Sequence, residues 1–435
     1  MKKQIILVDI PTKFTGIHTI TSISMITKTQ IQELSRQASP KIVATIQELV
    51  KTPSVSAVDT QDPISKVIVK LAKDLGLPAT IYKDEDDLEN EDERVVFIGN
   101  DFDKKEGVAI FSGFGTIDLG ENYHSNYDPF TPFIRDNKLY GSGAWKMKGT
   151  IGLSLHVKKM LEDLGYGHLL KCVYTNSVGA KLYTGIKMVL NKGLQARLAL
   201  VGGVMLFNEG KAFICTGCRG ALRLKVNITR MVPNLTTKVW QKNMSEYNPI
   251  DYFYKFWEEM KTKVAIYSSD PSFPDNVGSD QVVYEIHGGT GFGLSPNYAS
   301  ASISFLSVFV LSNKEYLQIA DSVAKKLTND APIKFEFEIV HDTPPVQLED
   351  TEFKNIFANE INTKLGLEVY HANDYYLDPL YYIQQKNIPT AFAQCLTGAN
   401  QNTVDEYLDI DNISVFAEIL LTSILREAGV EIADE

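Results

Sequence analysis

The order of apolar and polar positions along the chain switches between helical spacing and short β-rich runs. Residues 29–50 carry apolar side chains at Ile31, Leu34, Ile42 and Ile46, close to the helical period of about 3.6 residues. From residue 63 the pattern predicts helices at 64–75, 147–164 and 184–191 and strands at 79–82, 94–98, 108–111, 170–175 and 198–201. Strands separated by helix-length segments predict an α/β domain with a mostly parallel sheet and helices on both faces.

A different order of elements begins near Gly217. The pattern predicts a strand, a helix, two strands, a helix and a strand, at 221–228, 248–264, 281–287, 299–307, 314–327 and 333–340. This β-α-β-β-α-β order is that of a ferredoxin-like domain. After Pro344 and Pro345 the first pattern returns, with helix 351–365, a loop rich in Tyr and Asp, helix 380–386, strand 390–393 and helix 411–428.

These patterns together predict two domains and an arm. The α/β domain is discontinuous, at 29–216 and 343–435, and the ferredoxin-like domain is inserted at 217–342. Residues 1–28 contain two β-rich pieces, 4–10 and 17–26, and form an N-terminal arm. We expect this arm to add a strand to a sheet edge or to cover a partner surface.

Composition and charge narrow the class of partner. The chain has 435 residues, 44% of them apolar and 22% charged, which is typical of a globular protein. With 43 Lys and Arg against 54 Asp and Glu, its net charge is −11, the wrong sign for binding nucleic acid or an anionic membrane. No apolar run is long enough to span a bilayer, and Asp9 and Pro11 interrupt the only N-terminal run that resembles a secretory signal. With only four cysteines, we expect a cytoplasmic protein.

The most informative motif runs from Tyr127 to Gly149 and reads Y-D-P-F-T-P-F-I-R-D-N-K-L-Y-G-S-G-A-W-K-M-K-G. It resembles the pattern D-P-F followed by D-G-K-L-Y-G-R-G-A-x-D-M-K-G of the zinc-dependent aminoacylase and carboxypeptidase family, which includes acetylornithine deacetylase, succinyl-diaminopimelate desuccinylase, glutamate carboxypeptidase and dipeptidases. Supporting matches are Gly288, Gly289 and Pro296, the Pro344-Pro345 pair, and Asn387-Ile388-Pro389. The resemblance covers roughly residues 30 to 430. It implies a zinc-hydrolase-type α/β domain and a ferredoxin-like lid that commonly pairs two chains, and hence a homo-oligomer.

The metal ligands that the resemblance implies are missing. The first ligand motif, G-H-x-D, falls on Phe114 and Thr116 or, two residues on, on Asp118, and neither register contains a histidine. The metal-bridging aspartate falls on Lys146, and the catalytic D-E-E falls near Gly179 and Ala180, where no acid stands. The last histidine falls near Asn402. Two zinc ions need about four carboxylate or imidazole ligands and a bridging carboxylate, so we expect no family-type zinc site and no cofactor.

Two alternatives stay open at this point. The ammonium of Lys146 either fills the space and charge of a metal or points to solvent. Cys215 and Cys218 form a lone C-x-x-C, which is either a redox pair or two small residues at the start of the lid.

Four further residues are candidates for ligand binding, namely His124, Asp378, Tyr381 and Glu406. His124 and Asp118 lie in an acidic loop beside the expected cleft, and Glu406 follows the position of the lost histidine. Asp378 matches the aspartate of a segment that, in the family, helps to hold the substrate carboxylate, and Tyr381 belongs to a tyrosine-rich stretch that could line a pocket.

The sequence therefore predicts a catalytically degenerate homologue. It would bind a peptide or acyl-amino acid without hydrolysing it, or act as a structural partner in a homo-oligomer or heteromeric complex. The alternative is an amide-bond hydrolase with a rearranged or single-metal site.

Overall fold

A computed structural model describes most of the chain. It covers residues 25–55, 59–83, 93–119, 128–176, 184–201, 211–231, 247–273, 276–289, 296–374, 378–392 and 396–434. Within these ranges, the side chains of 211, 213, 215, 371–374, 378–380 and 392 are not described. The predicted strand at 4–10 and most of that at 17–26 lie outside the described residues.

The larger unit is built on a six-stranded sheet with the strand order β16-β8-β4-β7-β3-β2. Its strands are β2 (Ala79–Lys83), β3 (Arg94–Ile98), β4 (Val108–Gly113), β7 (Leu170–Thr175), β8 (Leu198–Val201) and β16 (Thr390–Phe392). Strands β16, β8, β4 and β7 are parallel. β3 pairs antiparallel with β7, and the edge strand β2 pairs antiparallel with β3. The mostly parallel sheet predicted from the sequence is confirmed.

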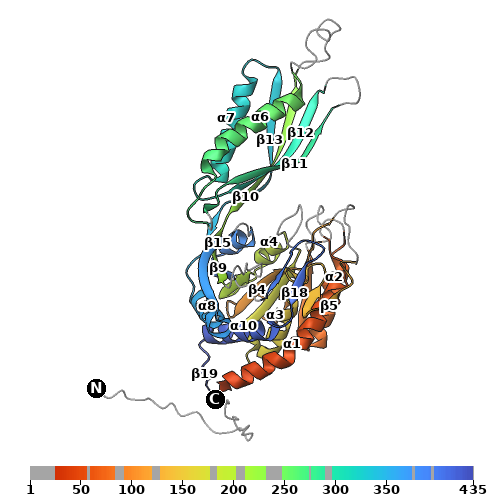
Figure 1. The fold of residues 1–435 in the computed structure, drawn as a ribbon, viewed down its shortest axis with the longest axis vertical. Helices are drawn as coiled ribbons and strands as arrows, with labels where there is room; N and C mark the ends of the chain where they lie inside the picture. The colour runs from red at the N-terminus through yellow and green to blue at the C-terminus, as the bar shows by residue number, and fades with distance from the viewer. Residues whose placement is uncertain are drawn as a thin grey trace, which may run out of the picture.

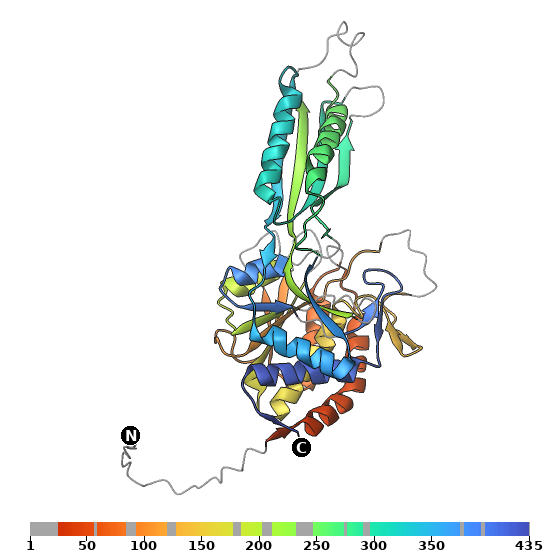
Figure 2. The ribbon, with the colours of Figure 1, turned by 60° about the vertical axis from the view of Figure 1, so that its left-hand side comes forward.

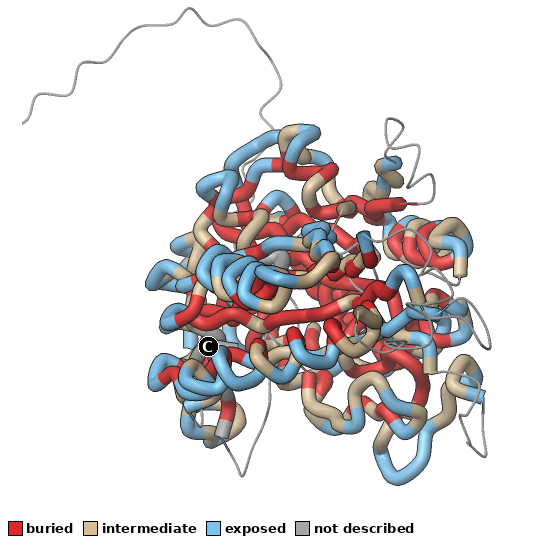
Figure 3. Tube along the Cα trace, turned by 90° about the horizontal axis from the view of Figure 1, so that it is seen from above, coloured by how far each residue is buried: buried red, intermediate tan, exposed pale blue. Residues whose placement is uncertain are grey.

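Helices cover both faces of this sheet (Figures 1 and 2). One face packs against α1 (Lys28–Val50), α2 (Asp62–Asp74), α3 (Lys148–Asp163), α8 (Glu352–Leu365) and α10 (Ile413–Glu427), which share one apolar cluster with the strands. The other face packs against α4 (Thr184–Asn191) and α9 (Asp378–Gln384). Seen from above, the buried residues form a continuous middle layer between exposed surfaces (Figure 3). Among the described residues, no helix combines the length and the hydropathy needed to cross a membrane.

The smaller unit stands at one end of the molecule (Figure 1). Its elements follow the order β10 (Gly220–Arg230), α6 (Pro249–Val264), β11 (Asp280–Gly288), β12 (Tyr298–Ser307), α7 (Asn313–Thr328) and β13 (Ile333–Thr343). The strands form an antiparallel sheet in the order β11-β12-β10-β13, with both helices packed on one face. This confirms the β-α-β-β-α-β order, and we call residues 220–343 the lid.

The loop predicted after residue 365 is wrong in part. Residues 368–374 form strand β15 (Glu368–Asp374), which pairs in parallel with β9 (Lys211–Cys218). β9 also pairs with β14 (Val346–Gln347), so the two chain segments that lead into and out of the lid meet in one three-stranded sheet. The tyrosines and aspartates of 368–374 suggested a loop, but pairing with a strand far away in the sequence overrides that local preference.

Two small sheets complete the larger unit. The first contains β5 (Phe133–Arg135), β6 (Lys138–Tyr140), β18 (Tyr407–Asp409) and β17 (Gly398–Ala399). The second pairs β1 (Ile26–Thr27) in parallel with β19 (Ile432–Ala433) and so joins the two ends of the described chain.

Candidate functional site

The motif that carries the family resemblance forms a tight loop between β6 and α3. Gly143 has a φ of +75°, which favours glycine, and a side chain there would also come within 2.9 Å of the Thr116 methyl. A Cβ on Gly149 would approach the carbonyl oxygen of Ala144 to 2.6 Å. The glycines therefore let this loop close against the segment that follows β4, at the carboxyl edge of the parallel strands, where α/β proteins usually place their sites.

The carboxylate of Glu406 holds this loop in place. It accepts backbone hydrogen bonds from Gly143 (3.2 Å), Trp145 (3.1 Å), Lys146 (2.9 Å) and Asn402 (3.3 Å). Glu406 is only 2% exposed, and burial raises the pKa of its carboxyl group, whereas the four N–H donors act in the opposite direction. The structure therefore uses this acid to satisfy backbone donors that the irregular loop leaves unpaired.

A buried lysine lies directly beside this loop. The ammonium of Lys148 donates a 3.0 Å hydrogen bond to the carbonyl of Thr52, just after α1, and lies 5.7 Å from the centre of the Phe130 ring. Burial lowers the pKa of Lys148 to about 7, and the negative charges of Glu406 and Asp59 only partly offset this effect. Lys148 was not among the residues singled out from the sequence. It is buried together with the other residues of the first half of α3.

A second buried carboxylate, which the sequence analysis also missed, lies at the same edge of the sheet. Glu93 stands just before β3 and accepts hydrogen bonds from Gln61 (3.1 Å) and from Thr175 at the end of β7 (3.0 Å). Burial raises its pKa, and hydrogen bonds from Thr184 and the backbone of Gly185 oppose that shift. Glu93 thus ties α2 and α4 to the sheet, next to the place where the resemblance puts the catalytic acids.

The structure brings some of the predicted site residues together and separates others. Thr116 approaches Gly143, and its buried hydroxyl has no hydrogen-bond partner among the described residues. Phe114 is 1% exposed and belongs to the apolar cluster under the helices, so its ring is part of the core. Asp118 is exposed to solvent.

Lys146 and Asn402 both reach Glu406 through their backbone. Each donates its N–H to the Glu406 carboxylate, and Asn402 takes a φ of 58°, which suits asparagine better than most residues. The side chain of Lys146 is half-buried. The position of the bridging aspartate and the position of the last histidine are therefore close to one acid, Glu406.

The remaining predicted residues are placed only in part. His124, Gly179 and Ala180 lie outside the described residues. Asp378 is the first residue of α9, and its side chain is not described. Tyr381, on the same helix, is half-buried, makes an edge contact with Tyr382 at 5.3 Å and packs on the apolar cluster beside α4.

The C-x-x-C lies entirely within strand β9. Two residues three apart in an extended strand have Cα atoms about 10 Å apart, beyond the reach of a disulfide, which needs roughly 4.4–6.8 Å. Cys218 is buried and is not in a disulfide. The geometry of β9 thus argues against the redox alternative.

The described residues do not fit a pair of zinc ions. In the part of the chain that the structure describes, no three His, Cys, Asp or Glu side chains are grouped so that they could hold a metal. The two buried acids at this edge, Glu93 and Glu406, are already hydrogen-bonded to neutral donors. A lysine stands where the resemblance puts the bridging ligand.

Comparison with solved structures gives the same fold. The chain is similar to the dipeptidase Dug1p from Saccharomyces cerevisiae (TM-score 0.67, 11% identity, covering 94% of this chain and 99% of that one). It is also similar to human carnosine dipeptidase 1, with a TM-score of 0.65 and 13% identity, covering 92% of this chain and 100% of that one. A third similar structure is the M20 family metallo-carboxypeptidase Sso-CP2 from Sulfolobus solfataricus. Its TM-score is 0.68 and its identity 17%, and the match covers 89% of this chain and 99% of that one. A search of curated protein sequences finds no match.

The sequence itself carries the family assignment. Residues 117–426 match the model of peptidase family M20/M25/M40. This span includes the whole motif around Lys146, the whole lid and the return of the chain into the larger unit. The match agrees with the resemblance seen in the sequence and with the α/β fold. The chain therefore belongs to peptidase family M20/M25/M40.

Proposed function

We propose that this chain is a non-hydrolytic member of its family, which binds a peptide or acyl-amino acid at the carboxyl edge of the sheet or serves as a structural partner in a complex. One observation carries the proposal. The loop that should present the metal-bridging aspartate presents Lys146, and the acid beside it, Glu406, is hydrogen-bonded to four backbone N–H groups. Without that bridging carboxylate, two adjacent dications would repel each other.

The zinc content of the full-length protein, purified without added metal, tests this proposal. We expect substantially less than one zinc per chain by elemental analysis, and no hydrolysis of dipeptides or N-acetyl-amino acids when zinc is added. About two equivalents per chain would overturn the proposal. Saturable binding of a non-hydrolysed dipeptide would favour the ligand-binding role over the structural one.

A second candidate is an amide hydrolase with a rearranged or single-metal site. It is favoured by the names of similar structures, which include dipeptidases, an aminopeptidase and a metallo-carboxypeptidase. Turnover of a dipeptide that chelator abolishes and one zinc equivalent restores would support this candidate over the first.

We also propose that the lid pairs two copies of the chain. Strand β11 is an edge of the lid sheet and exposes three apolar side chains, Val282 (47%), Tyr284 (59%) and Ile286 (41%). Edge strands with exposed apolar residues tend to acquire a partner. Light scattering on the full chain should give the mass of a dimer, and Tyr284→Lys should convert it to a monomer.

We also propose that residues 29–216 and 343–435 form one domain and that residues 217–342 form the other. Limited proteolysis at the boundaries would test this division. Cys172 and Cys218 are not in disulfides, which suits the reducing cytoplasm in which we place the protein.

A further inference from the structure

A groove of about 520 Å³ lies among the helices α1, α8 and α10. None of its lining residues belongs to the loop around Lys146 or to the carboxyl edge of the sheet, so it is separate from the candidate site. Its size falls within the range of small-molecule pockets, roughly 300–1,000 Å³. Its lining includes three cationic residues, Lys28, Lys364 and Arg426, and two acids, Glu360 and Glu418.

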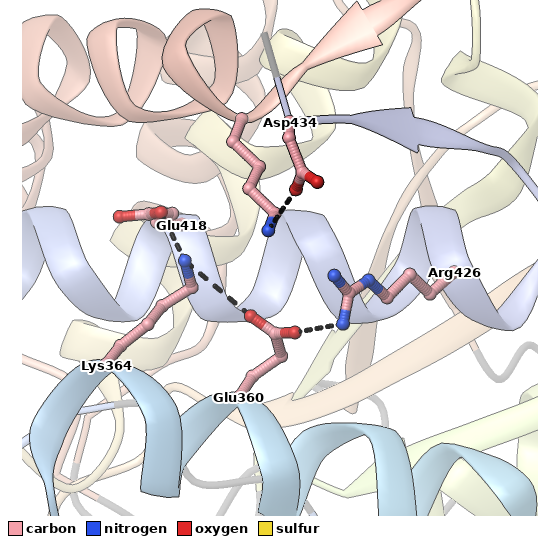
Figure 4. A network of polar contacts seen from close by, with 6 residues as sticks. Glu360, Lys364, Glu418, Arg426 and Asp434 are labelled. Atoms are coloured by element: carbon pink, nitrogen blue, oxygen red, sulfur yellow. Dashed lines mark hydrogen bonds and ion pairs between the residues drawn. The ribbon is translucent and has the colours of Figure 1, made fainter.

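The two acids of the groove are already neutralised (Figure 4). The carboxylate of Glu360 is 5% exposed and pairs with Arg426 at 2.5 Å and with Lys364 at 3.6 Å. Lys364 also pairs with Glu418. This chain of contacts fixes Arg426 and Lys364 on the groove wall. The third cation of the lining, Lys28, has no acid of the lining as its partner and pairs with Asp434 instead.

The donors of Arg426 are only partly used. A guanidinium has five N–H donors, and the contacts found among the described residues engage one terminal nitrogen, with Glu360. In Figure 4 the other terminal nitrogen of Arg426 points away from Glu360, towards the side on which Asp434 lies. Arginine side chains with free N–H groups suit carboxylates and phosphates, which accept two parallel hydrogen bonds.

The protein's own Asp434 lies at this end of the groove. Its carboxylate pairs with Lys28 at 2.5 Å, and the side chains of these two residues are 89% and 48% exposed. The hydrogen bond and charge of Lys28, with a smaller contribution from the charge of Arg426, lower the pKa of Asp434. An exposed ion pair contributes little to stability, so an incoming anion could displace Asp434 easily.

We propose that the Lys28–Arg426 end of this groove binds the oxyanion of a small molecule that carries a carboxylate or a phosphate, and that Asp434 competes for the same cations. The rest of the groove accommodates the remainder of the molecule against Ile31 and the neutral polar side chains of α8. This site is independent of whether the family's hydrolytic site is retained.

Titration of the full chain with inorganic phosphate and, separately, with succinate tests this proposal. Calorimetry at low ionic strength suits it, because salt screens exposed charges. Removal of the competitor by Asp434→Asn should tighten binding about twofold to fivefold, the ratio that corresponds to an exposed ion pair. The matched control is Asp163→Asn, which removes one carboxylate from an exposed pair with Lys159 on α3, outside the groove, and should leave binding unchanged.

Removal of the cations should have the opposite effect. Arg426→Gln should abolish saturable binding, but it also leaves buried Glu360 with one cation fewer. The second variant is therefore Lys28→Gln, which changes an exposed side chain and should weaken binding. Saturation by only one probe would narrow the ligand class to phosphates or to carboxylates. Equal affinity in wild type, Asp434→Asn and Lys28→Gln, or an absence of saturation with both probes, would overturn the proposal.

Discussion

The backbone N–H of Lys146 donates a 2.9 Å hydrogen bond to the carboxylate of Glu406, across 260 residues of sequence. Lys146 stands where the family resemblance puts a metal-bridging aspartate, and Glu406 follows the position of the last metal-binding histidine. The backbone of the motif is thus held by an acid from the far end of the chain, while the residues at the two positions are Lys146 and Asn402. This arrangement gives the loop's backbone N–H groups an acceptor within the protein.

Replacement of Glu406 by alanine should destabilise the protein. It leaves the N–H groups of Gly143, Trp145, Lys146 and Asn402 without their acceptor inside the protein, and we expect a loss of about 2–4 kcal/mol in the free energy of unfolding. Glu406→Gln keeps one acceptor oxygen and should lose less. Urea unfolding measures both, with the exposed Asp411→Asn as a control that should stay within about 0.5 kcal/mol of wild type.

Lys148 should make the protein more stable as the pH rises above neutrality. Burial lowers the pKa of Lys148 to about 7 in the folded state, from an ordinary value of 10.5. Between these two pH values the unfolded chain binds more protons than the folded one, so stability increases with pH, by at most about 1.4 kcal/mol per pH unit. Unfolding measured at pH 7, 8 and 9 should show this rise.

Lys148→Met provides the comparison for that measurement. Methionine retains much of the apolar stem but does not titrate, so this variant should lose the part of the pH dependence that Lys148 supplies. An unchanged slope between pH 7 and 9 in the variant would show that Lys148 is charged in the folded protein or that other groups determine the slope. Lys325→Met, on an exposed side chain of α7, should keep the slope of the wild type.

The elements of the lid could be predicted from the sequence because each has a strong periodic pattern. The expected helix at 314–327 is observed as Asn313–Thr328, where Ser312 and Glu315 form a capping box that fixes its start. Strand 333–340 extends to Thr343, which is paired with Ala221. These elements are specified locally, so the prediction needed no knowledge of their neighbours.

The candidate site was less predictable because it depends on contacts between distant segments. Strands β9 and β15 pair with each other although more than 150 residues separate them, and neither has a pattern that distinguishes it from a loop. The role of Glu406 follows from the return of the chain beside β6, which local sequence does not encode. The resemblance of residues 127–149 indicated where the site lies, but not the acid that holds its loop.

The C-x-x-C should remain reduced under oxidising conditions. Both residues lie in strand β9, whose register with β15 shifts at Thr216, and residues three apart in a strand are too distant for a disulfide. We therefore expect no disulfide between Cys215 and Cys218 after treatment with an oxidant, as peptide mass spectrometry would show. Cys218 is 1% exposed and should react with iodoacetamide only after unfolding. A disulfide between the two cysteines in the native protein would show that β9 departs from an extended strand at this point.

His156 should make the protein sensitive to mild acid. It lies on α3, is 4% exposed and makes a 2.9 Å hydrogen bond with the Thr45 hydroxyl of α1. Burial, with a smaller contribution from the charge of Lys41, lowers the pKa of His156 from 6.5 to about 4. Between these pH values the unfolded chain binds the extra proton, so stability falls as the pH drops, by about 2 kcal/mol from pH 6.5 to 5.

His156→Gln can keep the hydrogen bond to Thr45 without titrating and should lose less stability over this interval. His168→Gln, at an exposed position, should behave as wild type does. If wild type and His156→Gln lose the same stability between pH 6.5 and 5, the acid sensitivity arises from the carboxylates, and the contact between α1 and α3 does not depend on a neutral imidazole.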